Sequence, residues 1–482
     1  MHARTDTPRW ERAATAGVLL YALARLAYLA VAIDPALPPD EITHVGQIRH
    51  QLGSWGMPVD GESSYEHGLV SHRPFLYAWT FARWLALDPT GGSGLVWLRL
   101  GNVGLAAVTV LAALAWARRA GATAGQRVLV AVLLTNLPMW SFLSSSVNYD
   151  NAAMAIATLA FATLARYLDE HRGRDLLAAI ALLCAGAVTK AALLPLAALL
   201  AAATLAARGR AVLDDLATSL RPPLVREPAI AALLAACLAL GALAGGLYGR
   251  NLVRFGVLEP AANQVLPLEL AQRNRIFRQE HVLRSYRAGA IDERQALREI
   301  EQIGHAGDRA GARWMLQRAR ELREGDGEPL VGRLGYAGLW TPLMAERLFG
   351  VMGHRELYKT GPLAWAYSAT ALFALAALIW AVRRPDLHLR IAAGVGLGYT
   401  LILMQAVNYP IYRTSGLAVE AVQGRYLFPV LAPLLAALVI AAGRAVPKRA
   451  RWAVGVAIAG LFVLGDFPYL LWQADAVWWA AR

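Results

Sequence analysis

The chain has 482 residues, of which 57% are hydrophobic and 17% charged, and it carries a formal net charge of +13. Apolar runs of about 20 residues, the length that spans a bilayer, alternate with short charged clusters. This pattern excludes a soluble globular protein and predicts an all-α polytopic membrane protein. The basic residues gather at the ends of the apolar runs, as the positive-inside bias requires, so the charge indicates a membrane surface and no nucleic-acid partner.

The apolar runs predict about eleven transmembrane helices. They cover residues 13–33, 95–116, 128–143, 151–165, 176–189, 192–207, 228–248, 361–382, 391–408, 426–442 and 452–471. The first run follows a basic start, as in a signal peptide, but it is long and no small-residue cleavage site follows, so we interpret it as an uncleaved helix. Arginine-rich connections alternate with connections poor in basic residues, which predicts an N-terminus inside and a C-terminus outside.

Two connections on the outer side are long, residues 34–94 and residues 249–360. The first contains EITHVGQIRHQLGSWG and PFLYAWTFARWLAL, whose apolar spacing and aromatic residues favour helices lying in the membrane interface. An ordinary connector is the alternative. The second is charged and mostly helical in character. Neither indicates a soluble domain with its own core, so residues 1–482 are predicted to form one transmembrane domain.

Several classes of function find no support in the motifs. Cys184 and Cys237 lie inside apolar runs and predict neither a disulfide nor a metal cluster. No Walker-type or dinucleotide glycine loop is present, which argues against an ATP-driven pump. His44, His67 and His72 share the first outer loop, but their spacing matches no compact metal motif.

The polar residues that stand out all fall on the predicted outer side of the membrane. They are Asp40, Glu41, His44, His72, Arg73, Asn148, Asp150, Lys190, His354, Arg355, Arg425 and Tyr426. Ionisable groups at membrane depth are energetically expensive and are functional candidates by default.

Asp40 and Glu41 follow Pro38-Pro39 directly after the first predicted helix. Both acids can cap the helix that follows them. The functional alternative is a general base, because a carboxylate at an apolar boundary has a raised pKa and can take a proton from an attacking hydroxyl. A divalent metal on this pair is a weaker alternative, since two adjacent acids alone do not form a coordination set. No cofactor is predicted.

The basic candidates suit a phosphate group. Lys190 is one of three lysines in the chain, against 44 arginines, and it lies in an apolar hairpin. Arg425 begins a predicted span in QGRYLFP, where its planar fork can grip phosphate oxygens. The alternative for both is anchoring at the membrane interface, helped in the second case by Tyr426. Asp150 lies beside a helix start and has a helix cap as its alternative role.

Several segments together resemble the GT-C class of membrane glycosyltransferases, which use polyprenyl-phosphate sugars. The class includes the protein O-mannosyltransferases and the aminoarabinose transferase of lipid A. The resemblance is carried, in this order along the chain, by PPDEITH, SHRPFLYAW, VNYDN, AVTKAALLPL and QGRYLFP. PPDE, RLFGVMGHRELY and QGRYLFP are in addition similar to a poorly characterised bacterial branch of that class.

The resemblance implies a GT-C helix bundle in which interfacial helices of the first outer loop cover the site. It implies that an acid of that loop is the catalytic base, which corresponds to Asp40 with Glu41 as its neighbour. Donor phosphate binding is implied for Arg73, Lys190 and Arg425 with Tyr426, and a place near the site for Asp150. The chain departs from the family in SHRPFLYAW, since Arg73 stands where related enzymes often have Lys and Phe75 where they have Pro.

The resulting hypothesis is an inverting glycosyltransferase of a bacterial inner membrane, with its site on the periplasmic face. Its partners would be a polyprenyl-phosphate sugar such as an undecaprenyl-phosphate sugar, a lipid, glycan or protein acceptor, and membrane lipids. A transporter or flippase of a lipid-linked glycan is the first alternative, although related halves with paired discontinuous helices are not visible in the sequence. A membrane scaffold whose polar residues only cap helices is the second.

Overall fold

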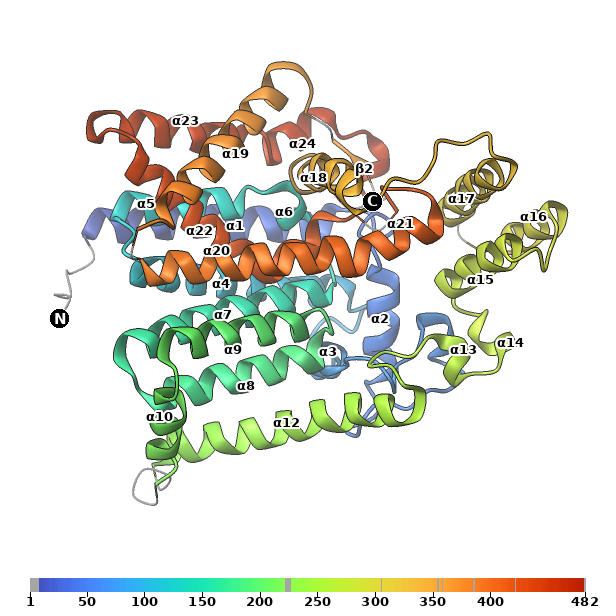
Figure 1. Ribbon diagram of the computed structural model, residues 1–482, viewed down its shortest axis with the longest axis horizontal. Helices are drawn as coiled ribbons and strands as arrows, with labels where there is room; N and C mark the ends of the chain where they lie inside the picture. Colours follow the sequence, from blue (N-terminus) through green and yellow to red (C-terminus); the bar gives the residue numbers. More distant parts are fainter. Residues whose placement is uncertain are drawn as a thin grey trace.

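The computed structural model describes residues 8–221, 227–304, 306–352, 355–357, 359–384, 386–420 and 422–480, with the side chains of residues 306, 307 and 356 excepted. Within these ranges the chain is almost entirely helical, and its two strands, β1 (Val351–Met352) and β2 (Arg355–Glu356), form one antiparallel pair. Long helices lie side by side and form a bundle (Figure 1).

Eight helical segments of the described chain are long and apolar enough to cross a membrane. Five are single helices: α1 (Arg9–Ala32), α4 (Leu95–Arg119), α7 (Tyr149–Glu170), α12 (Pro228–Phe255) and α19 (Gly361–Ala381). The sixth joins α20 (Leu387–Ile402), a π-helical turn (Leu403–Asn408) and α21 (Tyr409–Ser415). The last two join η3 (Gly424–Leu427) to α22 (Phe428–Ala445), and η4 (Lys448–Ala450) to α23 (Arg451–Leu464) and α24 (Phe467–Gln473).

Two further candidate spans are bent pairs of helices. α5 (Ala124–Thr135) and α6 (Pro138–Ser144) meet at 69°, and α9 (Leu193–Arg208) and α10 (Ala211–Ser219) at 102°. Pro138 explains the first bend, because proline lacks the N–H that would continue the helix. The remaining predicted run, 176–189, lies on α8 (Gly173–Thr189), a helix of 17 residues. All eleven predicted runs thus lie on helices, but the break within 128–143 was not predicted.

The centre of the bundle is formed by α4, α7 and α22. In the most apolar stretch of each, 50%, 72% and 61% of the residues are buried, against 11% for α12 and 17% for α19. α7 reads YDNAAMAIATLAFATLARYLDE, and its small residues allow the neighbouring helices to approach closely. The apolar outward faces of α12 and α19 are those that a bilayer covers.

The first outer loop contains the two helices that its sequence predicts, α2 (Glu41–His50) and α3 (Leu76–Leu85), with a short turn η1 (Tyr65–His67) between them. Ile48 of α2 and Tyr77 and Phe81 of α3 share one buried cluster with Leu98 of α4. The loop is therefore packed against one end of the bundle, the end called outer in the predicted topology, and it is not an ordinary connector.

The second long loop carries six helices. They are α13 (Ala262–Val265), α14 (Leu268–Ala271), α15 (Arg275–Arg287), α16 (Glu293–Glu301), α17 (Ala306–Glu324) and α18 (Arg333–Phe349). α15, α16 and α17 enclose a small apolar cluster of their own, which includes Tyr286, Ile300 and Leu316. This cluster differs from the expectation that the loop lacks a core.

A buried guanidinium joins four segments at the outer end of the bundle. Arg99 of α4 donates from Nε and Nη2 to the two carboxylate oxygens of Glu41, at 3.0 and 2.5 Å, and from Nη1 to the carbonyls of Ala30 and Ile33, at 3.0 and 2.9 Å. The N–H of Val147, just before α7, donates to the same carboxylate at 2.6 Å. Glu41 is thus buried with both oxygens occupied, which leaves neither oxygen free to take a proton from an acceptor hydroxyl.

The end of α1 is also held by the last described residues of the chain. Ile33 and Trp479 form an antiparallel bridge, the N–H of Asp34 donates to Trp478, and the N–H of Ala480 donates to Ala32. This pairing fixes the chain immediately before the PPDE segment.

We predict that Glu41→Gln lowers the free energy of unfolding by roughly 3 to 5 kcal/mol, because it leaves the buried Arg99 charge unpaired. Thermal unfolding in detergent measures the loss. A double variant, Glu41→Leu with Arg99→Met, should recover part of it, since a buried ion pair replaced by apolar groups is often tolerated. Full thermal stability in Glu41→Gln would contradict this role.

Candidate functional site

Asp40 occupies the N-cap position of α2, but its side chain makes no capping hydrogen bond. Its backbone is left-handed, with φ 61° and ψ 8°, a conformation that Asp and Asn tolerate better than most residues. The carboxylate turns away from the helix and accepts from Arg425 Nη2 at 2.7 Å. The side chain keeps 29% of its surface exposed, so this acid is accessible while Glu41 is not.

Four of the predicted residues form one chain of alternating charges. Arg425 contacts Asp40 on one side and reaches Asp150 on the other, with Nε 3.6 Å from the second carboxylate. Asp150 pairs in turn with Lys190. Asp150 is fully buried and Arg425 nearly so, whereas Asp40 is the exposed end. The structure thus brings Asp40, Lys190 and Arg425 together, as the sequence analysis expects.

Local sequence explains how these side chains meet. Asn148 is the N-cap of α7: its Oδ1 accepts from the N–H of Asp150 at 2.9 Å, and its Nδ2 donates to the carbonyl of Pro39 at 3.1 Å. Asp150 is therefore not the capping residue, and VNYDN is tied directly to PPDE. Gly424 lets η3 lie against α18, because a Cβ there would come within 2.6 Å of the Arg347 carbonyl.

Aromatic rings line the basic end of this charge chain. Lys190 Nζ lies 4.8 Å from the ring centre of Tyr149 and 5.3 Å from that of Tyr426. These cation-π contacts hold the ammonium in place without supplying a second anion. Tyr426 contributes a ring to the cluster in this way, beside Arg425.

His44 lies one helical turn after Asp40, with its ring 4.4 Å from Tyr149 and 6.1 Å from Tyr77. It is 3% exposed, and neither ring nitrogen has a hydrogen-bond partner among the described residues. Burial lowers the pKa of His44 to about 4, with Arg425 and Lys190 lowering it further and the two acids of the cluster opposing. The imidazole is therefore neutral at physiological pH and available for hydrogen bonding.

Arg73, Arg355 and His72 have partners outside the cluster. Arg73 is half exposed and pairs with Glu259 at 3.4 Å, and Arg355 pairs with Asp475 at 3.6 Å. His354 lies outside the described residues. His72, also named from the sequence, is hydrogen-bonded through Nδ1 to Asn251 at 2.9 Å.

Arg275 also lies at the site and was not predicted from the sequence. This residue of α15 pairs with Asp308 of α17, and its Nη2 lies 3.9 Å from the second oxygen of Asp40. No local signal distinguishes it, because α15 reads RIFRQEHVLRSYR and carries four arginines. The second outer loop thus reaches the site that the first outer loop presents.

No group of three or more His, Cys, Asp or Glu side chains that suits a metal ion occurs in the part of the chain that the structure describes. Asp40 and Asp150 face cations of the protein itself. What the cluster can do is exchange these internal partners for an incoming anion at Arg425 and Lys190, which would leave a carboxylate free to accept a proton.

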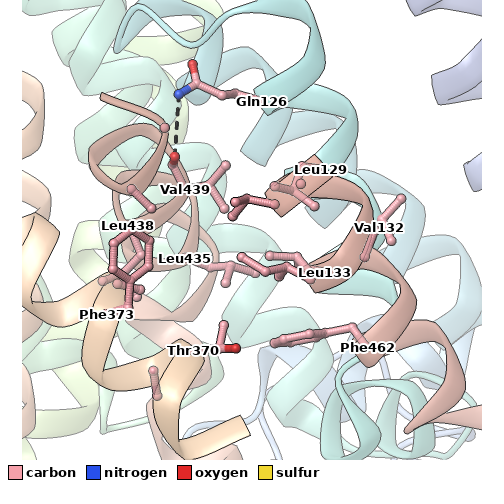
Figure 2. A pocket seen from close by; sticks show the side chains of 18 of the residues that line it. Gln126, Leu129, Val132, Leu133, Thr370, Phe373, Leu435, Leu438, Val439 and Phe462 are labelled. Atoms are coloured by element: carbon pink, nitrogen blue, oxygen red, sulfur yellow. Dashed lines mark hydrogen bonds between the residues drawn. The ribbon is translucent and has the colours of Figure 1, made fainter. Parts of the chain in front are cut away.

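A deep apolar groove of about 710 Å³ lies between α5, α19, α22 and α23. Figure 2 shows Leu129 and Leu133 on one wall and Leu435 on the other; the amide of Gln126, hydrogen-bonded to Val439 at 3.4 Å, is one of the few polar groups drawn. The lining continues to Leu427, two residues after Arg425. The groove thus runs between membrane helices toward the segment that carries the cluster.

No protein-family model matches the chain, and no curated protein matches its sequence. Among solved structures, it is similar to the archaeal oligosaccharyltransferase AglB from Archaeoglobus fulgidus in complex with an inhibitory peptide and a dolichol-phosphate, with a TM-score of 0.50, 13% identity, and coverage of 98% of this chain and 57% of that one. The apo form of an oligosaccharyltransferase from the same organism gives a TM-score of 0.47 and 14% identity over 97% of this chain and 56% of that one. The apo state of ArnT from Cupriavidus metallidurans gives a TM-score of 0.38 and 14% identity, over 89% of this chain and 78% of that one.

The first of these similarities shows the fold. The chain is an all-α polytopic membrane protein of the GT-C type, and the fold predicted from its sequence segments is confirmed. It spans little more than half the length of the oligosaccharyltransferase chain that it matches.

The low pKa of His44 predicts a loss of stability in acid. In the unfolded chain His44 takes up a proton below about pH 6.5. In the folded protein it does so only below about pH 4. Between pH 7.5 and 5.0 this should cost the wild type about 2 kcal/mol relative to His44→Phe, which lacks the titrating group. Thermal unfolding of both proteins at the two pH values measures the difference. Equal losses would contradict the neutral buried imidazole.

Proposed function

We propose that this protein is an inverting glycosyltransferase that moves a sugar from a polyprenyl-phosphate donor to an acceptor hydroxyl on the outer, periplasmic face of a bacterial inner membrane. The observation that carries the proposal is the contact of an accessible carboxylate, Asp40, with Arg425, which leads through Asp150 to Lys190. The dolichol-phosphate in the similar oligosaccharyltransferase supports a lipid phosphate as the donor group.

In this mechanism the donor phosphate binds at Arg425 and Lys190. The acceptor oxygen attacks the anomeric carbon and forms the new glycosidic bond while the bond from that carbon to the phosphate oxygen breaks. The leaving polyprenyl phosphate gains one negative charge in this step, and cations that meet this growing charge stabilise the transition state more than the ground state. A single in-line displacement inverts the anomeric configuration.

Asp40 receives the proton of the acceptor hydroxyl. In the described structure Arg425 Nη2 donates to this carboxylate at 2.7 Å. A phosphate that takes over the guanidinium would release Asp40, so that donor binding and activation of the base are coupled. Glu41 is assigned a structural role, because its oxygens are occupied by Arg99 and the N–H of Val147. Arg73 is left out of the proposed phosphate contact, because its ion pair with Glu259 is not part of the chain of charges that contains Arg425 and Lys190.

The apolar groove supplies a place for the donor tail. It lies among the spans and extends to Leu427, and a prenyl chain entering there would have its phosphate end near η3, the segment that carries Arg425. A transporter of lipid-linked glycans would use the same cations, but it has no need of an accessible carboxylate beside them.

We predict that Asp40→Asn lowers kcat for sugar transfer by about 10² to 10⁴, the usual contribution of a general base. Asn tolerates the left-handed backbone at this position, so the fold should be retained. Transfer of labelled sugar from a lipid donor by purified protein measures the effect. Glu62→Gln, an exposed acid of the same loop, is the control and should keep its activity. Full activity in Asp40→Asn would remove Asp40 as the base.

Filling the groove should weaken donor binding. Gly455 of α23 lines it and has open space around its missing side chain, so Gly455→Phe should occupy the groove without disturbing the core. We expect the KM for the lipid donor to rise about tenfold with kcat little changed, as loss of uniform binding predicts. Gly460→Phe, on the same helix and equally open but not part of the lining, is the matched control. An equal response of the two variants would contradict the assignment.

A further inference from the structure

A second, smaller cavity has Gln423, two residues before Arg425, in its lining. It measures about 190 Å³ and is formed where α6, α17, α18 and β1 meet Val419, Glu420, Val422 and Gln423. Its volume corresponds to about six water molecules at roughly 30 Å³ each. This is too small for a drug-sized ligand, which occupies roughly 300 Å³ or more, but it is adequate for one sugar ring.

The lining combines an aromatic face with side chains that accept hydrogen bonds and side chains that donate them. Trp314 contributes an indole that is 48% exposed, while Val351 and Val422 are buried in the floor. Glu420 can accept hydrogen bonds, and Gln423 can both donate and accept. A sugar ring needs this combination, because its C–H faces pack on an aromatic surface and its hydroxyls require donors and acceptors at the edge.

The carboxylate of Glu420 can accept further hydrogen bonds. No ion pair to it occurs within the described ranges, and burial together with nearby Glu280 raises the pKa of its side chain. A partly buried carboxylate without a cation is costly, and a hydroxyl that donates to it would offset part of that cost.

The cavity lies where the sugar of the donor has to be. Gln423 precedes Arg425 by two residues, and the sugar of a polyprenyl-phosphate donor is bonded directly to the phosphate. On the other side, Trp314 lies six residues after Asp308, about 9 Å along α17, and Asp308 pairs with the Arg275 that approaches Asp40. Gln423 and Trp314 thus connect the cavity to the two segments that carry Arg425 and Asp308.

We propose that the cavity lined by Trp314, Glu420 and Gln423 is a monosaccharide subsite that binds the sugar of the lipid-linked donor and selects it. The inference rests on the proposed glycosyl transfer and assigns residues that the charged cluster does not contain. Glu420 accepts from a sugar hydroxyl, and the indole of Trp314 covers one face of the ring.

Two kinds of lipid, one without a sugar and one with a sugar, separate this subsite from the phosphate site. Undecaprenyl phosphate carries no sugar, and undecaprenyl-phosphate glucose, galactose and mannose carry one. The dissociation constants of the full-length protein in nanodiscs are measured for each lipid, and the hexose lipid that the wild type binds best serves as the probe. Glu420→Gln and Trp314→Ala should each raise Kd for that lipid about tenfold, the loss expected of one good hydrogen bond or packed ring. Kd for undecaprenyl phosphate should change less than twofold.

The controls keep the result interpretable. Trp314→Phe keeps an aromatic face and should recover most of the affinity, and Glu324→Gln on the same helix should change neither constant. Arg425→Lys should weaken both lipids alike, because it alters the phosphate site. Equal weakening of both lipids in Glu420→Gln and Trp314→Ala, or no change in either, would overturn the subsite while the proposed function stands. A wild type that binds none of the lipids would overturn both.

Discussion

The outer end of the bundle depends on one buried guanidinium. Arg99 satisfies the last carbonyls of α1, and its pairing with Glu41 fixes the start of α2 and, through Val147, the approach to α7. A charge removed from water is tolerated only where its partners have good geometry, so these segments have little freedom to move independently. The rigidity matters for the neighbouring residue, because the position of Asp40 follows from where Glu41 is anchored.

The cluster that this anchor positions is electrically balanced. Two carboxylates and two cations alternate from Asp40 through Arg425 and Asp150 to Lys190, so the resting site has no net charge at the membrane boundary. An anionic ligand therefore has to compete with the internal acids. In the proposed mechanism the donor phosphate replaces Asp40 at the guanidinium, where it can accept two parallel hydrogen bonds. The lining of the groove includes Leu427 and that of the small cavity includes Gln423, so both include residues within two positions of Arg425.

The sequence was informative where a residue type is rare in its surroundings. Lys190 stands out in a chain nearly devoid of lysine, and an acid pair after two prolines stands out at the end of an apolar helix. Sequence alone could not tell Asp40 from Glu41, since which acid points inward depends on the left-handed backbone at residue 40 and on a partner 58 residues away.

The remaining differences between the sequence-based prediction and the structure also arise from tertiary packing. Arg275 is one arginine among many in a charged helix, and only tertiary packing brings it to Asp40. Arg73 looked equivalent to the other cations until packing gave it a different partner in Glu259. Helix positions follow from local hydropathy, which is why the apolar runs were found, whereas ion pairs join residues that the chain order keeps far apart.

The separation between Asp40 and Arg425 has a consequence for how the protein is made. Arg425 follows its partner by 385 residues, and Lys190 follows Asp150 by 40. During translation the pair of Asp150 and Lys190 can form early, whereas Asp40 has no Arg425 to pair with until nearly all other helices have been synthesised. Assembly of the site is thus among the last events of biogenesis, and insertion of α22 is the step that completes it.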